Sequence, residues 1–451
     1  MSRGHRLCAV NSGATRTATR IEGRTAGEIS ESIRNLVGAG ELKPADPLSP
    51  IRELARELGV HRNTVAAAYR LLVAAGVAET RGRHGTFIRS LPTVHGEGGL
   101  ALAGHVDLSS GNPDPDLLPD LGGALTRTSY TPPLYGTAAT DAALEKWARR
   151  SMEQELGRPA SITITNGAVD AVERLLTAHL TRGDAVAIED PCFLASVDTL
   201  RVNGFKAIPM PVDVEGITLA GLRHALKRGA RAVVCTPRAH NPTGANLSAD
   251  RATALRSLLI DYPHVLVIED DHFSAVSGQS YHRLAPTITT RWALVRSVSK
   301  FLGPDLRVAI VASDVDTAAR LGTRLRPGAN WVSHLQQRLT ADLLCDPEVA
   351  AQLDTARRTY AKRREILIQA LTDKEITVTR PADGLNIWIP FERDSSVIVD
   401  RLADQGWLVR DGAQFAATPS SPHNAIRVTA STITADRARR FAATLSKILA
   451  D

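Results

Sequence analysis

The chain has 451 residues, 43% of them hydrophobic, so it is longer than one ordinary domain and apolar enough to bury more than one core. Its formal net charge is +6, and residues 1–90, with 14 Lys and Arg against 8 Asp and Glu, carry the whole excess. The four cysteines are widely spaced, which argues against a zinc site or a disulfide framework, and no apolar run approaches the 18 residues of a membrane span.

The position of the charge sets the first functional expectation. A basic N-terminal fifth favours contact with a polyanion, although a merely soluble basic domain would carry the same excess. The opening residues lack the apolar stretch of a signal peptide, so we expect a cytoplasmic location and no membrane partner. Residues 1–21 are rich in Arg, Ser, Thr and Gly and are predicted to be disordered.

Residues 22–90 predict three helices. The run Thr25-Ala26-Gly27-Glu28 reads as a capping box that starts the first helix. Ser49-Pro50 starts the second helix, with proline in the tolerated first turn, and Gly59 closes it. The third helix exposes Arg62-Asn63-Thr64 in its first turn.

A two-stranded wing is predicted after these helices, at residues 77–80 and 86–88. Two helices joined by a short turn that contains glycine are typical of a helix-turn-helix, in which the last helix enters the major groove. On the pattern alone, a small three-helix packing domain is the alternative.

The same segment resembles the winged-helix domain of GntR-type repressors. The resemblance rests on Ile51-Arg52-Glu53-Leu54-Ala55, on Leu58-Gly59-Val60-His61-Arg62-Asn63-Thr64-Val65, and on Gly82 with Gly85-Thr86-Phe87. His61 stands where a small hydroxyl residue is more usual. The resemblance implies that DNA is approached by Arg52, Arg62, Asn63, Thr64, His84 and Gly85.

After a linker predicted at residues 91–106, strands and helices alternate, which favours a mainly parallel sheet covered on both faces. Buried strands are predicted at residues 161–165, 185–189, 232–236, 265–269, 292–297 and 308–312. Beyond about residue 330, a helical pattern and shorter strands are typical of a smaller α+β subdomain. Those strands are predicted at residues 376–379, 385–389 and 425–429.

Polar or aromatic residues follow several of these strands. Asn241, in Asn241-Pro242-Thr243-Gly244, can donate to a phenolate oxygen, although the tetrapeptide equally suits an Asx turn. Asp270 can pair with a protonated pyridine nitrogen, although a solvated acidic loop has the same composition. Asn166-Gly167-Ala168-Val169 opens a helix whose free N–H groups suit a phosphate. Phe193 can stack on a ring or pack in the core.

Lys300 follows a hydroxyl-rich run, Ser297-Val298-Ser299. Its amine can form a Schiff base with an aldehyde, while Ser297 and Arg307 suit a phosphate as donor and bidentate cation. By residue type alone Lys300 would be a solvated surface charge. Its neighbours instead favour an aldehyde cofactor that carries a phosphate.

These elements, in this order, resemble fold-type I pyridoxal-phosphate enzymes of the aminotransferase superfamily over residues 107–451. The resemblance implies a covalent link at Lys300, a pyridinium partner in Asp270 and a ring-oxygen contact from Asn241. It further implies that Phe193 stacks on the ring, and that the phosphate is held by Ala168, Val169, Ser297 and Arg307.

Two further residues are placed by this resemblance. Arg427 matches the arginine that binds a substrate carboxylate, with a surface arginine as the alternative. His272 stands where most relatives carry a Tyr that contacts the cofactor oxygen, and it can still donate there. Cys192 and Asn386 also depart from the usual Gly and His.

A GntR-type reader joined to this fold is similar to MocR-type regulators, and residues 269–274, 298–307 and 331–334 are closest to the PtsJ type within that class. The resemblance implies a multidomain transcription regulator, a homodimer, that binds a double-stranded DNA operator and uses pyridoxal 5'-phosphate. Its effector would be a vitamer or an amino compound, and its targets pyridoxal salvage or synthesis genes. A catalytically active fold-type I aminotransferase is the alternative. No metal is expected.

Overall fold

The computed structural model describes residues 21–80, 82–90, 98, 103–380, 382–420 and 423–450. The chain divides into two compact units, Met1–Thr93 and Val94–Asp451. The predicted disordered extension, apart from Ile21, and most of the predicted linker at 91–106 lie outside the described residues. Among the residues described, no helix combines the length and the apolar character needed to cross a bilayer.

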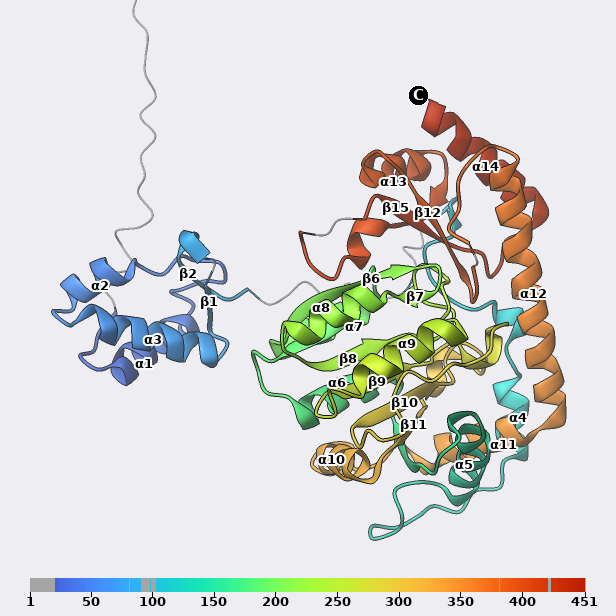
Figure 1. Ribbon diagram of the computed structural model, residues 1–451, viewed down its shortest axis with the longest axis horizontal. Helices are drawn as coiled ribbons and strands as arrows, with labels where there is room; N and C mark the ends of the chain where they lie inside the picture. The colour runs from blue at the N-terminus through green and yellow to red at the C-terminus, as the bar shows by residue number, and fades with distance from the viewer. Residues whose placement is uncertain are drawn as a thin grey trace, which may run out of the picture. The chain divides into compact units, whose positions relative to one another are not determined.

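The N-terminal unit contains three helices and a two-stranded antiparallel wing (Figure 1). The elements are α1 (Ala26–Gly38), α2 (Ile51–Glu57), α3 (Arg62–Ala74), β1 (Ala78–Thr80) and β2 (Thr86–Ile88). The predicted capping box is present, because the Thr25 side chain accepts from the Glu28 N–H at 3.2 Å and the Glu28 carboxylate accepts from the Thr25 N–H at 3.3 Å. The apolar faces meet in one core, which includes Ile29, Ile33, Leu54, Val65, Leu72 and Ile88. The predicted winged helix-turn-helix is confirmed.

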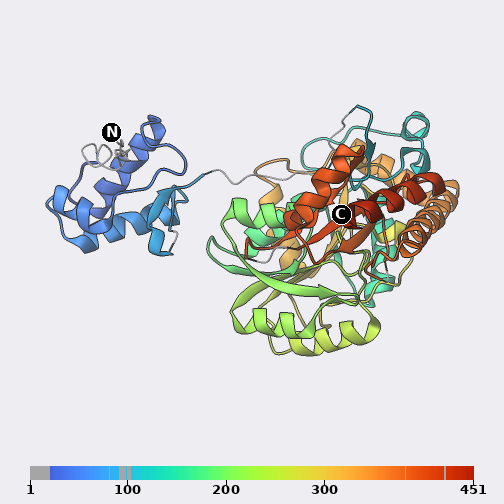
Figure 2. The same cartoon turned by 90° about the horizontal axis from the view of Figure 1, so that it is seen from above.

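An eight-stranded sheet with the order β4-β11-β10-β9-β8-β5-β6-β7 forms the centre of the C-terminal unit (Figures 1 and 2). Its strands are β4 (Ser161–Thr165), β5 (Ala185–Asp190), β6 (Lys206–Asp213), β7 (Gly216–Ile217), β8 (Ala230–Cys235), β9 (Leu266–Asp270), β10 (Trp292–Ser297) and β11 (Ala309–Ser313). β11 pairs antiparallel with β4 and β10, and β7 with β6, whereas the remaining neighbours are parallel. The mainly parallel sheet is therefore confirmed, while β6 and β7 were not predicted.

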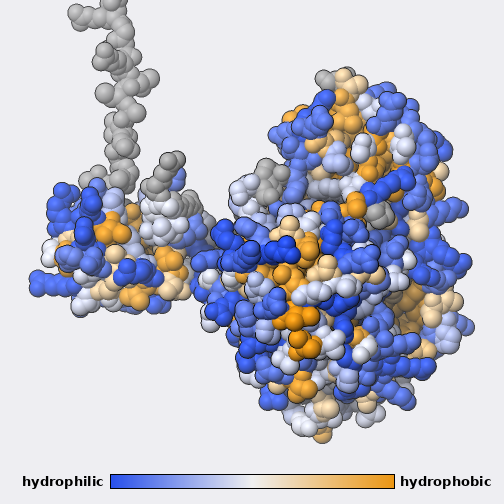
Figure 3. Space-filling model, in the orientation of Figure 1, coloured by the Kyte–Doolittle hydropathy of each residue, from blue (hydrophilic) through white to orange (hydrophobic). Residues whose placement is uncertain are grey.

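Helices cover both faces of this sheet, because successive side chains of its strands point to opposite sides. On one face lie α6 (Ala168–His179), α7 (Leu194–Asn203) and α10 (Val315–Leu325), packed through residues such as Leu175, Leu200 and Leu321. On the other face lie α5 (Ala142–Leu156), α8 (Leu219–Lys227), α9 (Ala249–Leu259) and α11 (His334–Cys345), packed through Leu144, Leu222, Leu255 and Leu339. In the view of Figure 3 the surface is mostly hydrophilic, with apolar side chains in separate patches.

A long helix, α12 (Pro347–Thr372), leads to the smaller α+β subdomain. There β12 (Asn386–Pro390), β15 (Ala425–Thr429) and β14 (Arg410–Asp411) form a three-stranded sheet covered by α13 (Ser395–Asp404) and α14 (Ala435–Ala450). The strand predicted at residues 376–379 is wrong. That segment makes a backbone hydrogen bond from Thr379 N to Trp388 O, and one such bond does not make a ladder.

Candidate functional site

The candidate site lies at the carboxyl edge of the parallel strands, where ligands of open α/β sheets bind. β4, β5, β8, β9 and β10 end there, and the predicted cofactor residues lie at or after these ends: Ala168, Val169, Phe193, Asn241, Asp270, His272, Ser297 and Lys300. Residues far apart in sequence converge because a parallel sheet aligns the ends of its strands.

Lys300 is half-buried in the turn after β10. Its Nζ donates to the carbonyl oxygen of Gly111 at 2.8 Å and lies 6.0 Å from the centre of the Phe273 ring. Gly111 in turn donates its N–H to Thr429 Oγ1 at 3.0 Å, which joins the lysine to the smaller subdomain. Gly111 and Thr429 escaped the sequence analysis, because a backbone carbonyl acceptor leaves no trace in residue type.

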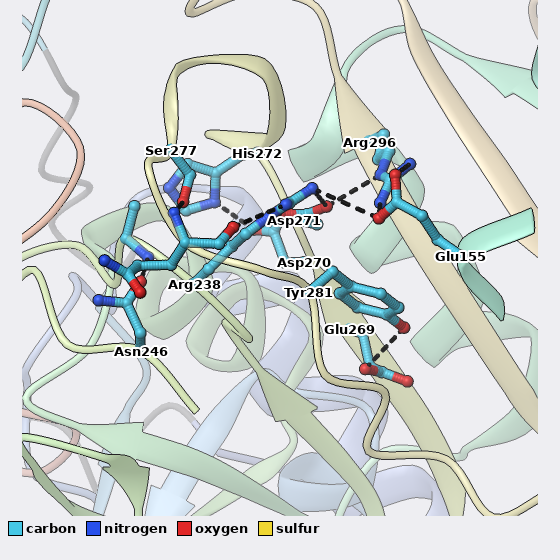
Figure 4. Close-up of polar contacts among 12 residues, drawn as sticks. Glu155, Arg238, Asn246, Glu269, Asp270, Asp271, His272, Ser277, Tyr281 and Arg296 are labelled. Atoms are coloured by element: carbon cyan, nitrogen blue, oxygen red, sulfur yellow. Dashed lines mark hydrogen bonds and ion pairs between the residues drawn. The ribbon is translucent and has the colours of Figure 1, made fainter. Parts of the chain in front are cut away.

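Asp270 ends β9, and its side chain is 7% exposed. Its Oδ2 lies 3.3 Å from His272 Nδ1, within ion-pair distance, whereas its Oδ1 has no hydrogen-bond partner (Figure 4). The His272 ring is tilted by 30° against Phe193 at 5.7 Å and lies 4.6 Å from Phe273. A buried acceptor without a donor is costly, so this geometry suits a ligand that brings an N–H group.

Asn241 and Arg427 contact each other directly. Arg427 is fully buried and donates through Nη1 to Asn241 Oδ1 at 3.0 Å and through Nη2 to Ser109 O at 2.6 Å. Asn386 Nδ2 also donates to Asn241 Oδ1, at 3.3 Å. The alternative of a surface arginine is therefore wrong for Arg427. The Asn386 side chain, set aside as a departure in the sequence, belongs to this cluster.

The first turn of α6 faces the predicted phosphate arginine. Arg307 Nη2 donates to Asn166 O at 3.0 Å, and a Cβ on Gly167 would lie 2.8 Å from the same nitrogen. Gly167 has φ +93°, so glycine is required there by conformation and by space. Ser297 Oγ donates to Ser299 Oγ at 3.0 Å, on the lysine segment. A helix N-terminus with a guanidinium beside it forms a cradle for a phosphate.

Behind the candidate site, Asp271 is the centre of a buried ion network (Figure 4). Arg238 donates to both of its oxygens, at 2.8 and 2.9 Å, and Arg296 Nε donates to Oδ2 at 2.9 Å. Arg296 also holds Glu155 in a bidentate pair at 3.1 and 2.6 Å. Burial raises the pKa of the Asp271 carboxyl, but the charges of Arg296 and Arg238 outweigh burial and hold that pKa below its ordinary value.

Glu269, on the same side of β9 as Asp271, sits in a different environment. Its carboxylate accepts from the Tyr281 hydroxyl at 3.0 Å and from the N–H groups of Leu284 and Ala285, at 2.9 and 3.1 Å. Complete burial raises the pKa of Glu269, although these hydrogen bonds oppose the rise. The structural role of both carboxylates depends on residues distant in the chain and has no local sequence signal.

The predicted DNA contacts lie on exposed parts of the N-terminal unit. Arg52 is exposed on α2, and Arg62, Asn63 and Thr64 form the first turn of α3. His84 is exposed in the wing, and Gly85 has φ +101° with open space at its Cβ position. His61 is the N-cap of α3, because its Nδ1 accepts from the Asn63 N–H at 3.2 Å.

Each of the two units matches a known protein family. Residues 25–88 match "Bacterial regulatory proteins, gntR family", and residues 104–445 match "Aminotransferase class I and II". The chain therefore belongs to the aminotransferase class I and II family and carries a GntR DNA-binding domain, the combination found in MocR-type regulators.

The chain is also similar to individual regulators and to solved aminotransferase structures. The chain is 49% identical over 430 residues, 95% of this chain and 99% of the relative, to the vitamin B6 salvage pathway transcriptional repressor PtsJ of Salmonella typhimurium. It is 27% identical to the pyridoxine biosynthesis transcriptional regulator PdxR of Corynebacterium glutamicum, over 84% of this chain and 86% of the relative. Among solved structures, kynurenine aminotransferase of Pyrococcus horikoshii superposes with a TM-score of 0.70 at 21% identity, covering 77% and 91% of the two chains, which shows the shared fold.

The cofactor of this family is pyridoxal 5'-phosphate, and the protein is a DNA-binding transcription regulator that uses it. The described residues fit that group: the partnerless Asp270 Oδ1 suits a pyridinium N–H, and the α6 terminus with Arg307 suits a phosphate. When bound, the cofactor supplies an aldehyde for a lysine amine and an electron-withdrawing ring. Among the described residues, no cluster of three or more His, Cys, Asp or Glu could hold a metal ion.

Proposed function

We propose that the C-terminal unit senses vitamin B6 vitamers and controls operator binding by the N-terminal unit, with pyridoxal salvage or synthesis genes as targets. The supporting observation is the convergence of Lys300, Asp270 and the Arg307 cradle at one sheet edge, in a chain 49% identical to a vitamin B6 salvage repressor. A ligand that prefers one arrangement of the unit shifts the DNA-competent population by its differential affinity.

The proposed cofactor contacts are those of the sequence analysis. Lys300 forms the covalent link, Asp270 pairs with the ring nitrogen, and Asn241 and His272 contact the ring oxygen. Phe193 stacks on the ring, since it already lies tilted by 30° against His272. The phosphate is held by Ala168, Val169, Ser297 and Arg307, and Arg427 binds an effector carboxylate.

Borohydride trapping tests the covalent link. Reduction of the loaded protein followed by peptide mapping is expected to place a pyridoxyl label on Lys300, and Lys300→Ala is expected to carry none. Lys362, exposed on α12, gives a matched variant, Lys362→Ala, that is expected to keep the label. A label on another lysine would refute the assignment.

The proposed DNA surface is the first turn of α3 with Arg52, His84 and Gly85. Arg62→Ala and His84→Ala are expected to weaken operator binding by roughly 1–3 kcal/mol each, without changing cofactor content. Affinity is expected to fall steeply with salt, because phosphate contacts release counterions. Arg34→Ala, which removes a charge that is 56% exposed on α1, is the matched control in gel-shift titrations. Unchanged affinity in both variants would remove this surface from the proposal.

We propose a cytoplasmic homodimer whose two readers bind paired half-sites. The segment before α5 supports a second copy, because Leu134 is 79% and Tyr135 is 90% exposed, and exposed large apolar side chains mark interfaces. Sedimentation of Leu134→Asp is expected to show a larger monomer fraction than wild type.

The proposed domain boundaries are residues 22–90 for the DNA-binding domain and 107–451 for the cofactor-binding domain, with a linker at 91–106.

Operator titration with different cofactor forms tests sensing itself. The apo, pyridoxal phosphate and pyridoxamine phosphate forms are compared at one salt concentration. Coupling of roughly 1–3 kcal/mol predicts a several-fold to hundred-fold spread in affinity. Equal affinity for all three would show that the cofactor site does not control DNA binding.

An active aminotransferase is the second candidate, and Arg427 favours it. The arginine is fully buried against Asn241, as a carboxylate-binding residue beside the ring would be. Turnover with a panel of amino and keto acids decides between the two, and steady-state product formation without operator regulation would support the enzyme.

A further inference from the structure

A cavity of about 420 Å³ borders the lysine segment, residues 297–301, and its lining includes none of the predicted cofactor residues. Trp147 of α5 and Leu353 of α12 form apolar walls, and Val298 and Phe301 of the lysine segment contribute the floor. Its polar part includes Arg238, Arg296 and Glu155, together with the ion pair of Asp354 and Arg357. A cavity of this size, mostly apolar with a few convergent polar groups, is typical of a small-molecule site.

The polar part is asymmetric. Asp271 is completely buried and holds the Nε atoms of both arginines, so that side of each guanidinium is fixed. The outward fork of Arg296 holds Glu155, whose side chain is 38% exposed. Glu155 is the penultimate residue of α5 and lies 3.7 Å from Arg238 as well, so its partly exposed carboxylate is the part of the network next to solvent.

We propose that this cavity binds a small organic anion with an apolar body, whose carboxylate or phosphate replaces Glu155 on Arg296. With a carboxylate ligand the exchange keeps the charge of the network constant, because one monoanion leaves the guanidinium as another arrives, whereas a phosphate adds up to one further negative charge. It also gains the burial of an apolar body against Trp147 and Phe301. The guanidinium presents two parallel donors, the geometry that carboxylate and phosphate oxygens match.

The cavity touches the cofactor site through one short segment. Val298 and Phe301 line the cavity, while Ser297 and Lys300 belong to the candidate cofactor site. Asp271, held by the same arginines, follows Asp270 directly. An occupant therefore lies against the residues that position the lysine, and this influence on the cofactor rests on the proposed function, whereas binding in the cavity does not.

Calorimetric titration of the full-length, cofactor-loaded protein with 3-phenylpropanoate tests the site. One molecule is expected to bind per chain, and 3-phenylpropanol, which lacks the charge, is expected to bind at least ~10-fold more weakly. Glu155→Ala removes the competing carboxylate and is expected to tighten binding of the acid by roughly 10-fold. Equal affinity for acid and alcohol, or no effect of Glu155→Ala, would overturn the proposal.

Cavity-filling variants locate the binding. Ala350→Phe from α12 and Ser151→Phe from α5 each place a ring in the cavity and are expected to abolish saturable binding. Absorption of the cofactor checks that each variant folds and loads normally. Retained binding in both loaded variants would place the acid elsewhere, including at Arg427. If the wild-type protein binds the acid in the cavity but its operator affinity does not depend on the cofactor, the proposed function is refuted and the cavity proposal stands.

Discussion

Asp270 and Asp271 are chain neighbours with opposite environments. Asp270 faces the candidate cofactor site with one oxygen that has no hydrogen-bond partner, whereas Asp271 faces the other side and receives three hydrogen bonds from two arginines. Strand alternation at the end of β9 produces this division, since successive side chains point to opposite faces of a sheet. The Asp271 carboxylate is therefore held within the protein, whereas the Asp270 carboxylate keeps an acceptor oxygen for a ligand.

The largest expected effect is the loss of stability when the buried Asp271 carboxylate is neutralised. Asp271→Asn removes the buried counter-charge of two guanidiniums and leaves them only the partly exposed Glu155, so it is expected to lower the free energy of unfolding by about 3–5 kcal/mol. Asp316→Asn, which removes an exposed partner of Arg320, is the matched control and is expected to cost at most about 1 kcal/mol. Urea denaturation of the apo proteins measures both, and similar losses would show that burial does not distinguish the two pairs.

The pH dependence of that loss is a second way to test the comparison. Because the pKa of Asp271 is below its ordinary value, its contribution is present at neutral pH and is lost as pH falls through the folded-state pKa. The stability gap between wild type and Asp271→Asn is expected to be constant above about pH 5 and to shrink below it. A gap that instead shrinks as pH rises would contradict the assigned ion pairs.

Asp270→Asn is expected to act on the cofactor rather than on the fold. A charge-assisted hydrogen bond contributes about 1.5–3 kcal/mol, so affinity for pyridoxal phosphate is expected to fall roughly 10- to 100-fold. Apo stability is expected to change little, since Asp270 Oδ1 has no hydrogen-bond donor to lose. Equilibrium titration by cofactor absorption measures the affinity, and unchanged binding would assign the ring nitrogen to another partner.

The smallest expected effect concerns His272. His272→Phe preserves the ring contacts with Phe193 and Phe273 and removes the polar nitrogens. Loss of one neutral hydrogen bond is expected to weaken cofactor binding by about 0.5–1.5 kcal/mol, and His272→Tyr is expected to restore it. Equal affinity in all three proteins would show that His272 only packs against the ring.

Much of the fold and of the candidate cofactor site could be predicted from the sequence. The capping box at Thr25, six of the central strands and the order of the cofactor motifs follow from local pattern, because each depends on residues near one another in the chain. The role of Asp271 depends on Glu155 and Arg296, which are 141 residues apart and meet only in the folded sheet. β6 was missed because proline and exposed residues interrupt its apolar alternation.

At the start of α3, an imidazole occupies the place of the more usual capping hydroxyl. Since His61 Nδ1 accepts from a backbone N–H, that nitrogen carries no proton, and the neutral ring is the tautomer protonated at Nε2. The exposed ring therefore holds its donor on the side remote from the accepting nitrogen, next in sequence to Arg62, Asn63 and Thr64, the proposed DNA contacts. A second proton, on Nδ1, would remove the acceptor and with it the cap.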